Sequence, residues 1–262
     1  MDLSNENIIH VKNGDVEYLQ FRELLKYSDR LVHCYSLKPL QFSDKNPEAP
    51  SNYKKICTAL GIDDNNIIKS AQKHTNVVKD IKEYTNEKFE YVDGFITKRE
   101  NIPLVTKYAD CTPIILYDKN QNIIGNVHSG WRGTLQRISQ KAVELMSKNY
   151  NSNLKDIIVC IGPCIKQCHF QVEEDFIKQF EKEFGNVEKY YKIGEVIEGK
   201  QKYYFDTTSL IIDYLTEIGI KPENIFDSKI CSVCNSDKMY SYRAEKEKAD
   251  RNMNIVELWG RT

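Results

Sequence analysis

The fold is decided by a stretch that reads Thr112-Pro-Ile-Ile-Leu-Tyr117, then Asp118-Lys-Asn-Gln-Asn122, then Ile123-Ile-Gly-Asn-Val-His128. Two apolar runs flank five polar residues of the kind that favours turns, so the sequence predicts an antiparallel hairpin. Cys111 comes directly before the first strand, and His128 ends the second. Because paired strands lie about 5 Å apart, the thiol and the imidazole should meet at one end of the sheet.

Strands and helices alternate irregularly around this hairpin. Further strands are predicted over residues 66–72 and 156–161, which are rich in isoleucine and valine. Apolar residues recur at helical spacing over 134–149, from Phe176 to Phe184 and from Leu210 to Gly219. Mixed elements without a strict βαβ rhythm predict an α/β fold, a single domain over residues 1–262 with a mixed β-sheet flanked by helices.

Composition and charge limit the classes of function. The chain has 262 residues, of which 40% are hydrophobic and 29% are charged, as in folded globular proteins. Its net charge of -1 lacks the basic excess of a general nucleic-acid binder, so no nucleic-acid partner is predicted. We find no apolar run long enough to span a membrane and no signal peptide, so a cytoplasmic location without membrane contact is expected. The sequence does not indicate an oligomeric state.

The sequence contains eight cysteines, and in the cytoplasm these are expected to be free thiols rather than disulfides. Cys160 falls in an apolar strand and is predicted to be in the core. The pair Cys231-Ser-Val-Cys234 has the spacing of a zinc ribbon, and Cys164, Cys168 and His169 lie close together in sequence. A structural zinc needs a second pair at ribbon spacing, and none is evident, so a second metal is not predicted.

The pairing of Cys111 with His128 has three interpretations. The two residues can be metal ligands, or they can form a nucleophile pair in which the imidazole deprotonates the thiol. They can also be a buried cysteine and a hydrogen-bonded histidine without a chemical role. The residues by themselves do not decide between these interpretations.

The turn after His128 favours a site over a structural role. Gly130 and Gly133 flank Trp131 and Arg132, and a helix is predicted to start at about Thr134. Glycines before a helix let backbone N–H groups approach an anion, and a guanidinium suits phosphate. The alternative is an ordinary strand-to-helix turn with a surface arginine.

Several motifs occur in the order found in a known family. They are Asp93-Gly-Phe-Ile-Thr97, Ala109-Asp-Cys-Thr-Pro113, His128-Ser-Gly-Trp-Arg-Gly133, Gly162-Pro-Cys-Ile165, Cys168-His-Phe-Gln-Val172 and Tyr240-Ser-Tyr-Arg243. Over roughly residues 67–258 the chain resembles the laccase-domain family, also called multicopper polyphenol oxidases. The same family is described as purine nucleoside phosphorylases and, in bacteria, as the peptidoglycan editing factor.

The resemblance implies a zinc site, with copper less favoured. The implied ligands are His74, which stands in a Gln-x-His motif, together with Cys111 and His128. Three protein ligands leave the fourth tetrahedral position for water or substrate, as in catalytic zinc sites. Asp110, beside the ligand Cys111, is a candidate proton acceptor or support for the ligands, and capping of the local turn is the alternative.

The turn with Gly130, Arg132 and Gly133 is expected to bind substrate together with Arg243. The chain departs from the family pattern at two nearby positions. Thr75 stands where the family often has glycine, and Arg243 is followed by Ala244 where a second arginine is common. The second departure bears on substrate contacts.

The implied function is a zinc-dependent purine nucleoside enzyme that uses phosphate to cleave adenosine or inosine and also deaminates adenosine. A copper-dependent polyphenol oxidase is disfavoured because several coppers need many histidines and the chain has five. Two further functions compete with the nucleoside enzyme: a Cys-His amidohydrolase acting on peptidoglycan precursors, with Cys111 as nucleophile, and a non-enzymatic binding role. The sequence does not indicate which reaction dominates or which purine is preferred.

Overall fold

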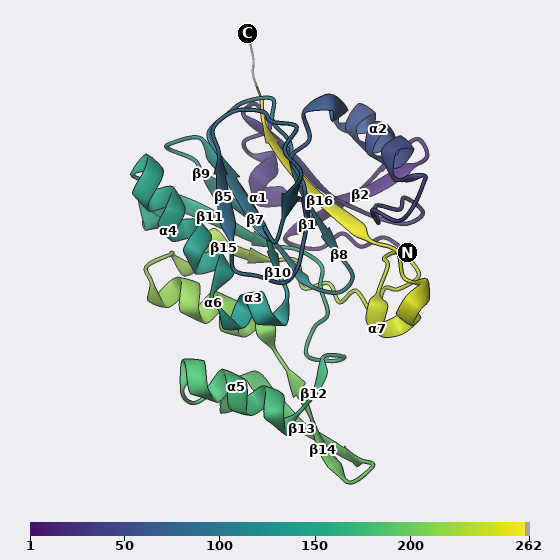
Figure 1. The fold of residues 1–262 in the computed structure, drawn as a ribbon, viewed down its shortest axis with the longest axis vertical. Coiled ribbons are helices and arrows are strands. Elements are labelled where there is room, and N and C mark those ends of the chain that lie inside the picture. The colour runs from purple at the N-terminus through teal and green to yellow at the C-terminus, as the bar shows by residue number, and fades with distance from the viewer. Residues whose placement is uncertain (260–262) are drawn as a thin grey trace.

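Two large β-sheets pack face to face in the computed structural model, which describes residues 1–259 (Figure 1). The five-stranded sheet has the order β1 (Ile8–Asn13), β2 (Val16–Phe21), β3 (Leu31–Ser36), β16 (Asn252–Leu258) and β8 (Leu104–Tyr108). The six-stranded sheet has the order β15 (Ile225–Asp227), β11 (Ile157–Ile161), β9 (Thr112–Asp118), β10 (Ile123–Ser129), β7 (Gly94–Thr97) and β5 (Val78–Ile81).

Two smaller sheets and the helices complete the fold. The small sheets are β12 (Gln171–Glu173), β14 (Lys200–Phe205) and β13 (Tyr191–Ile197), and the pair β4 (Ser70–Ala71) and β6 (Phe89–Glu90). The α-helices are α1 (Arg22–Leu25), α2 (Ala49–Leu60), α3 (Trp131–Leu135), α4 (Ile138–Tyr150), α5 (Glu174–Phe184), α6 (Thr207–Glu217) and α7 (Tyr242–Glu245). Short 3-10 turns occupy Asp64–Asn66, Leu154–Asp156, Glu188–Tyr190, Pro222–Asn224 and Lys246–Lys248.

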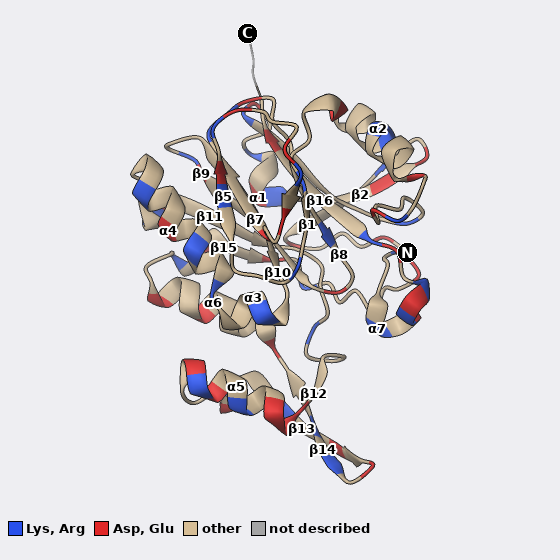
Figure 2. Ribbon diagram, in the orientation of Figure 1, with Lys and Arg blue, Asp and Glu red and all other residues tan. Residues whose placement is uncertain are grey.

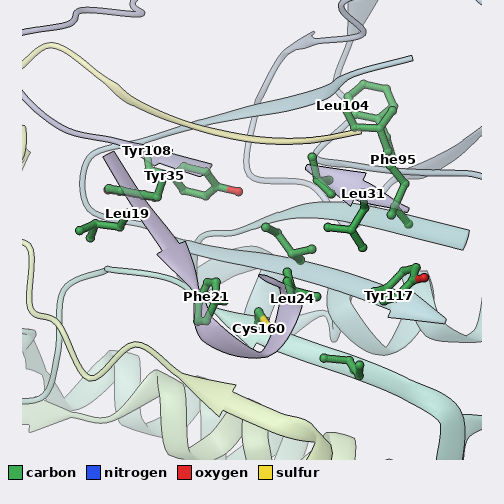
Figure 3. Packing of buried hydrophobic residues seen from close by; sticks show 14 of the residues in the cluster. Leu19, Phe21, Leu24, Leu31, Tyr35, Phe95, Leu104, Tyr108, Tyr117 and Cys160 are labelled. Atoms are coloured by element: carbon green, nitrogen blue, oxygen red, sulfur yellow. The ribbon is translucent and has the colours of Figure 1, made fainter. Parts of the chain in front are cut away.

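The predicted hairpin, β9 with β10, lies at the centre of the six-stranded sheet and is buried on both faces. Ile115 and Tyr117 belong to the core shared with the five-stranded sheet, and Figure 3 shows Tyr117 in that core. Ile114 and Leu116 point the other way, into the core under α4, α5 and α6. Side chains of a strand alternate between its faces, so a strand covered on both faces reads as a continuous apolar run. The hairpin's sequence therefore reflects its central position.

The positions of the hydrophobic cores define the order of the sheets and helices as layers. Figure 3 shows Leu19, Tyr35 and Leu104 of the five-stranded sheet in the same cluster as Tyr117 and Cys160 of the six-stranded sheet. A third core lies between the outer face of the five-stranded sheet and α2. The order of layers is thus helix, sheet, sheet, helices, and α5 with the three-stranded sheet extends from one end (Figure 1).

A buried polar cluster joins the two large sheets. The amide nitrogen of Asn126, on β10, donates to the carbonyls of Leu104 (2.8 Å) and Asn254 (3.0 Å) on the opposite sheet. Its amide oxygen accepts from the Thr106 hydroxyl (2.6 Å) and the Asn254 amide (3.0 Å). Tyr108 OH also donates to the Val127 carbonyl (2.9 Å). These contacts fix β8 beside β10 directly beneath the ends that carry Cys111 and His128.

The mixed α/β fold predicted from the sequence is confirmed, including the mixed six-stranded sheet, in which β9 pairs antiparallel and β15 parallel with β11. The strand at 157–161 and the helices at 174–184 and 207–217 are also confirmed. The five-stranded sheet, which brings together the N-terminal strands and β16, did not emerge from local patterns. Acidic and basic residues are interspersed along α5, in keeping with the near-neutral charge (Figure 2).

Two predicted elements are wrong in extent. The strand predicted over 66–72 shrinks to Ser70–Ala71, because Asp63 caps a 3-10 turn over Asp64–Asn66. The helix predicted to begin at about Thr134 is two helices, α3 and α4, separated at Arg137, whose φ of 57° lies in the left-handed region. None of the helices within residues 1–259 is long and apolar enough to cross a membrane.

Replacing Asn126 by alanine should lower the free energy of unfolding by at least about 2 kcal/mol, because each buried polar group left unpaired costs about 1–3 kcal/mol. Urea unfolding followed by circular dichroism measures this change. The control is Asn86→Ala, at an exposed position, for which we expect a change within about 0.5 kcal/mol. Equal effects of the two substitutions would show that the cluster does not join the sheets energetically.

Candidate metal centre and active-site cavity

Three side chains from separate segments meet at the end of the hairpin. Cys111 lies in the crossover 109–111, where the chain passes from β8 of one large sheet to β9 of the other. His128 lies near the end of β10, opposite Pro113. His74 lies in the loop between β4 and β5, with a φ of 60°. The ligand atoms of these three residues all lie within 4.8 Å of one another, so the predicted meeting of thiol and imidazole is confirmed.

The carboxylate of Asp93 holds two of these residues in place. It is buried and comes directly before β7, the strand that pairs with β10. Its Oδ1 accepts from the His128 Nδ1 (2.7 Å) and from the His74 backbone N–H (3.0 Å). Its Oδ2 accepts from the backbone N–H and the hydroxyl of Thr75, both at 2.8 Å, and from the Lys73 N–H (3.2 Å). One buried carboxylate therefore shapes the His74 loop and orients the His128 ring.

Charge explains the protonation states of this group in the metal-free protein. Burial by itself would raise the pKa of the Cys111 thiol, but the neighbouring His128 and His74 outweigh it and lower that pKa to about 6. Burial would lower the pKa of His128, but Cys111 and Asp93 raise it to about 9. Burial would likewise raise the pKa of Asp93, whereas His128 and Thr75 lower it to about 2. A thiolate ready to bind metal follows from this arrangement.

The donor set fits zinc. One thiolate and two imidazoles are ligands that zinc prefers. The Cys111 Sγ and the His74 Nε2 are 3.5 Å apart, and Zn–S bonds of about 2.3 Å with Zn–N bonds of about 2.0–2.1 Å give a tetrahedral edge of about 3.5 Å. Because Asp93 accepts from the Nδ1 of His128, the Nε2 is left for the metal, the usual arrangement for a metal-bound histidine.

The glycines after β10 have a packing role. A Cβ on Gly130 would lie 2.4 Å from the His74 ring and 3.2 Å from the Cys111 sulfur, and one on Gly133 would lie 3.1 Å from the Thr75 carbonyl. Both glycines thus allow the turn to press against the ligand residues. Arg132 is exposed, and its guanidinium stacks 4.3 Å from the centre of the Trp131 ring. The anion site expected at this turn stays a prediction.

Asp110 connects three segments of the chain. Its carboxylate accepts from the Ser232 hydroxyl (2.6 Å) and from the Arg243 backbone N–H (2.8 Å). Its carbonyl accepts from the Ile165 N–H (3.0 Å). Arg243 in turn donates through Nη1 to the carbonyl of His169 (2.7 Å). These bonds make Asp110 a support of the cavity wall, and its predicted part in proton transfer remains untested.

Two cavities border the candidate ligands. The first has a volume of about 220 Å³, and aromatic and polar side chains line it together with the ligands: His74, Cys111, Trp131, Phe170, Thr207 and Arg243. The second has a volume of about 600 Å³, and cations predominate around it: Lys45, Lys73, Lys107 and Arg251, with Asp44 paired to Lys107. His74, Cys111 and Tyr242 border both cavities.

Two contributors to this site, Asp93 and Phe170, were not predicted from the sequence. Asp93 stands in one of the motifs that carry the family resemblance, but nothing local assigned it a role, because its partners lie 18–35 residues away. Phe170 reaches the first cavity from the loop after β11. An acidic residue shortly before the short apolar run Phe95-Ile96 was the available signal for Asp93, and we see none for Phe170.

A family model described as "Multi-copper polyphenol oxidoreductase laccase" matches residues 37–259. The chain belongs to this family. Among its relatives, a purine nucleoside phosphorylase of Borreliella burgdorferi is 32% identical over 177 residues, which cover 67% of this chain and 73% of that protein. A purine nucleoside phosphorylase of Clostridium acetobutylicum is 29% identical and covers 83% and 86%. An adenosine deaminase from an unknown prokaryotic organism is 27% identical and covers 72% and 73%.

Solved structures share the fold. YlmD from Geobacillus stearothermophilus superposes with a TM-score of 0.86 at 19% identity, covering 96% of this chain and 99% of that one. The YfiH protein of Bacillus licheniformis gives a TM-score of 0.84 at 21% identity, covering 95% and 98%. The layered arrangement described above is therefore that of the YfiH-like fold.

Replacing Asp93 by asparagine should weaken zinc binding at the three-ligand site by about 10–100-fold, because removing a carboxylate behind a ligating histidine has effects of that size. Competition with a chromophoric chelator measures the affinity. The matched control is Asp175→Asn, an exposed carboxylate on α5, which should bind zinc like the wild type. Unchanged affinity in a folded Asp93→Asn protein would remove Asp93 from the site.

Proposed function

We propose that this chain is a zinc-dependent purine nucleoside enzyme. Its main reaction is cleavage of adenosine or inosine by phosphate, accompanied by some conversion of adenosine to inosine. The observation that carries the proposal is a group of three side chains able to bind a metal, of which His74 and Cys111 border an aromatic cavity. The names of the relatives, which include both purine nucleoside phosphorylases and an adenosine deaminase, support the same two chemistries.

The first cavity suits a purine base. Trp131 and Phe170 line it, and aromatic faces stack on bases at about 1–3 kcal/mol per base. Arg243 is held by backbone carbonyls of His169 and Gln171 (2.7 and 3.3 Å). A guanidinium has five N–H donors, so Arg243 retains donors for the nucleoside. Ser129 and Thr207 add hydroxyl groups to this wall.

The second cavity suits phosphate, because Lys45, Lys73 and Arg251 bring positive charge to one side of the ligands. A nucleoside in the first cavity and phosphate in the second would meet beside His74 and Cys111, which border both. Phosphorolysis requires this meeting, because the phosphate oxygen bonds to the sugar carbon as the bond to the base breaks. The zinc, when bound, supplies Lewis acidity and an activated water for deamination.

A Cys-His hydrolase is the second candidate, and the lowered pKa of Cys111 favours it. In such an enzyme His128 would keep Cys111 ionised for attack on an amide carbon, and no metal would take part. The family description alone favours a copper oxidase. Several coppers need many histidines, and within residues 1–259 two of them, His74 and His128, lie at the site. His10 pairs with Glu17 and His33 bonds the Phe21 N–H, both away from it.

Incubation of zinc-loaded protein with inosine should yield hypoxanthine and ribose 1-phosphate in equal amounts, and only when phosphate is present. Adenosine should give adenine together with some inosine. His128→Ala should reduce both reactions by more than about 100-fold, since it removes a metal ligand. Cys57→Ala, a buried cysteine on α2, is the control for loss of a core thiol. The products are separated and quantified by chromatography. Absence of free base and of inosine would refute the proposal.

Replacing Lys73 by alanine should raise the KM for phosphate by at least about tenfold, because one charge-assisted contact contributes about 1.5–3 kcal/mol. Arg132→Ala is the matched comparison, since Arg132 is also exposed but lies beside Trp131 instead of in the basic cavity. A larger increase for Arg132→Ala would place phosphate at the glycine turn, as the sequence suggested, and would contradict the assignment to the second cavity.

The pH dependence of alkylation separates the zinc enzyme from the Cys-His hydrolase. In metal-free protein the Cys111 pKa of about 6, below its ordinary value of 9.0, keeps the thiolate populated above pH 6 and lost below it. Iodoacetamide should therefore modify Cys111 with a midpoint near pH 6. Zinc should protect Cys111 and restore activity together. If instead the protein without metal is catalytically active, and alkylation of Cys111 abolishes that activity, the protein is a Cys-His hydrolase and not a zinc enzyme.

A further inference from the structure

Four further metal-binding side chains gather in a place that the proposed reaction does not use. Cys168 and His169 lie in the loop after β11, and Cys231 and Cys234 lie in the loop after β15. Their ligand atoms all lie within 4.8 Å of one another. The partner of Cys231 and Cys234 is not a second pair at ribbon spacing but the adjacent Cys168-His169, which the fold brings close to them.

The separations match the edges of a zinc tetrahedron. The sulfurs of Cys168 and Cys234 are 3.8 Å apart, and Zn–S bonds of about 2.3 Å give about 3.8 Å. The Nδ1 of His169 lies 3.2, 3.5 and 3.7 Å from the sulfurs of Cys168, Cys234 and Cys231. The corresponding edge for zinc with one sulfur and one nitrogen is about 3.5 Å. Four of the six separations among these ligand atoms are thus close to the edges of a zinc tetrahedron, and the other two are at most 4.8 Å.

Backbone contacts hold the two loops in this arrangement. Cys164 and Cys231 form an isolated parallel bridge, in which the Ser232 N–H donates to the Cys164 carbonyl (3.0 Å). The Asn235 N–H and its amide both donate to the Cys231 carbonyl (3.2 and 2.8 Å), which closes the turn that carries Cys234. Backbone hydrogen bonds of the fold therefore hold the loop after β11 next to the loop that carries Cys231 and Cys234.

We propose that Cys168, His169, Cys231 and Cys234 bind a second zinc ion in a closed structural site. Four protein ligands fill the tetrahedron, so no position remains for substrate, in contrast to the three-ligand centre. Three thiolates select zinc over magnesium and calcium, which take oxygen ligands. Cys168 and Cys234 are exposed, so their thiols reach solvent metal without opening of the core.

This second zinc would hold the wall of the active-site cavity. Its ligand His169 presents the backbone carbonyl that accepts from Arg243 (2.7 Å), and the next residue, Phe170, lines the first cavity. Ser232, between the ligands Cys231 and Cys234, donates to the carboxylate of Asp110 (2.6 Å). The ion would therefore be a positioning element for Arg243, Phe170 and Asp110.

Elemental analysis of full-length protein purified in the presence of zinc should find two zinc ions per chain. Cys168→Ser and Cys234→Ser should each retain one, and the double variant His128→Ala/Cys234→Ser should retain none. Cys57→Ala, the matched cysteine control, should retain two. The Cys168→Ser and Cys234→Ser proteins should also melt at a lower temperature than the wild type, and this difference should vanish when all proteins are compared after chelation. Equal zinc content in wild type and Cys234→Ser would overturn the proposal.

Protection of thiols in the native wild type gives a test that does not depend on folding of the variants. In zinc-loaded protein, iodoacetamide should leave Cys168 and Cys234 unmodified despite their exposure, and a chelator should make both react, as measured by mass spectrometry of peptides. Modification of both thiols in the zinc-loaded protein would refute the site. A Cys168–Cys234 disulfide in protein prepared without oxidants would do so as well. The outcome is independent of nucleoside turnover, so failure here leaves the proposed reaction untouched.

Discussion

The candidate site depends on the hydrogen bonds that the buried carboxylate of Asp93 accepts. The carboxylate places the imidazole of His128 and the backbone of residues 73–75 around one anionic group, and so it brings His74 toward Cys111. Removing a carboxylate from water is costly unless it is fully hydrogen-bonded, and this one accepts from five groups. These hydrogen bonds stabilise the loop in which His74 has a left-handed backbone conformation, and they hold that loop beside Cys111.

The fold explains why the site lies at this place. The chain crosses between the two large sheets in three residues, 109–111, and the crossover puts Cys111 next to the end of β10. The inter-sheet contacts of Asn126 and Tyr108 hold the two sheets in register below it. The loop after β11 supplies Phe170 to the first cavity, and the loop after β15 supplies Ser232, whose hydroxyl donates to Asp110 in the wall of that cavity. Rigid strands thus position the loops that carry the candidate site.

The sequence predicted what depends on local patterns and motifs. The hairpin and the meeting of Cys111 with His128 were predicted from two apolar runs and the polar turn between them. The assignment of His74 required the family resemblance. The predicted helix start at about Thr134 failed because Arg137 adopts a left-handed conformation that periodicity does not register. Asp93 and the group around His169 were missed because their partners are 18–66 residues distant in sequence, and only the tertiary fold brings them together.

We infer that Asp93 holds His74 and His128 so that they form, with Cys111, an open zinc centre beside the first cavity. Anomalous diffraction at the zinc absorption edge, from crystals soaked with inosine, tests it most directly. We expect an anomalous peak bonded to His74 Nε2, Cys111 Sγ and His128 Nε2, with its fourth position open to water or nucleoside and the base between Trp131 and Phe170. Absence of this peak from zinc-loaded crystals, or a fourth protein ligand closing the centre, would contradict it.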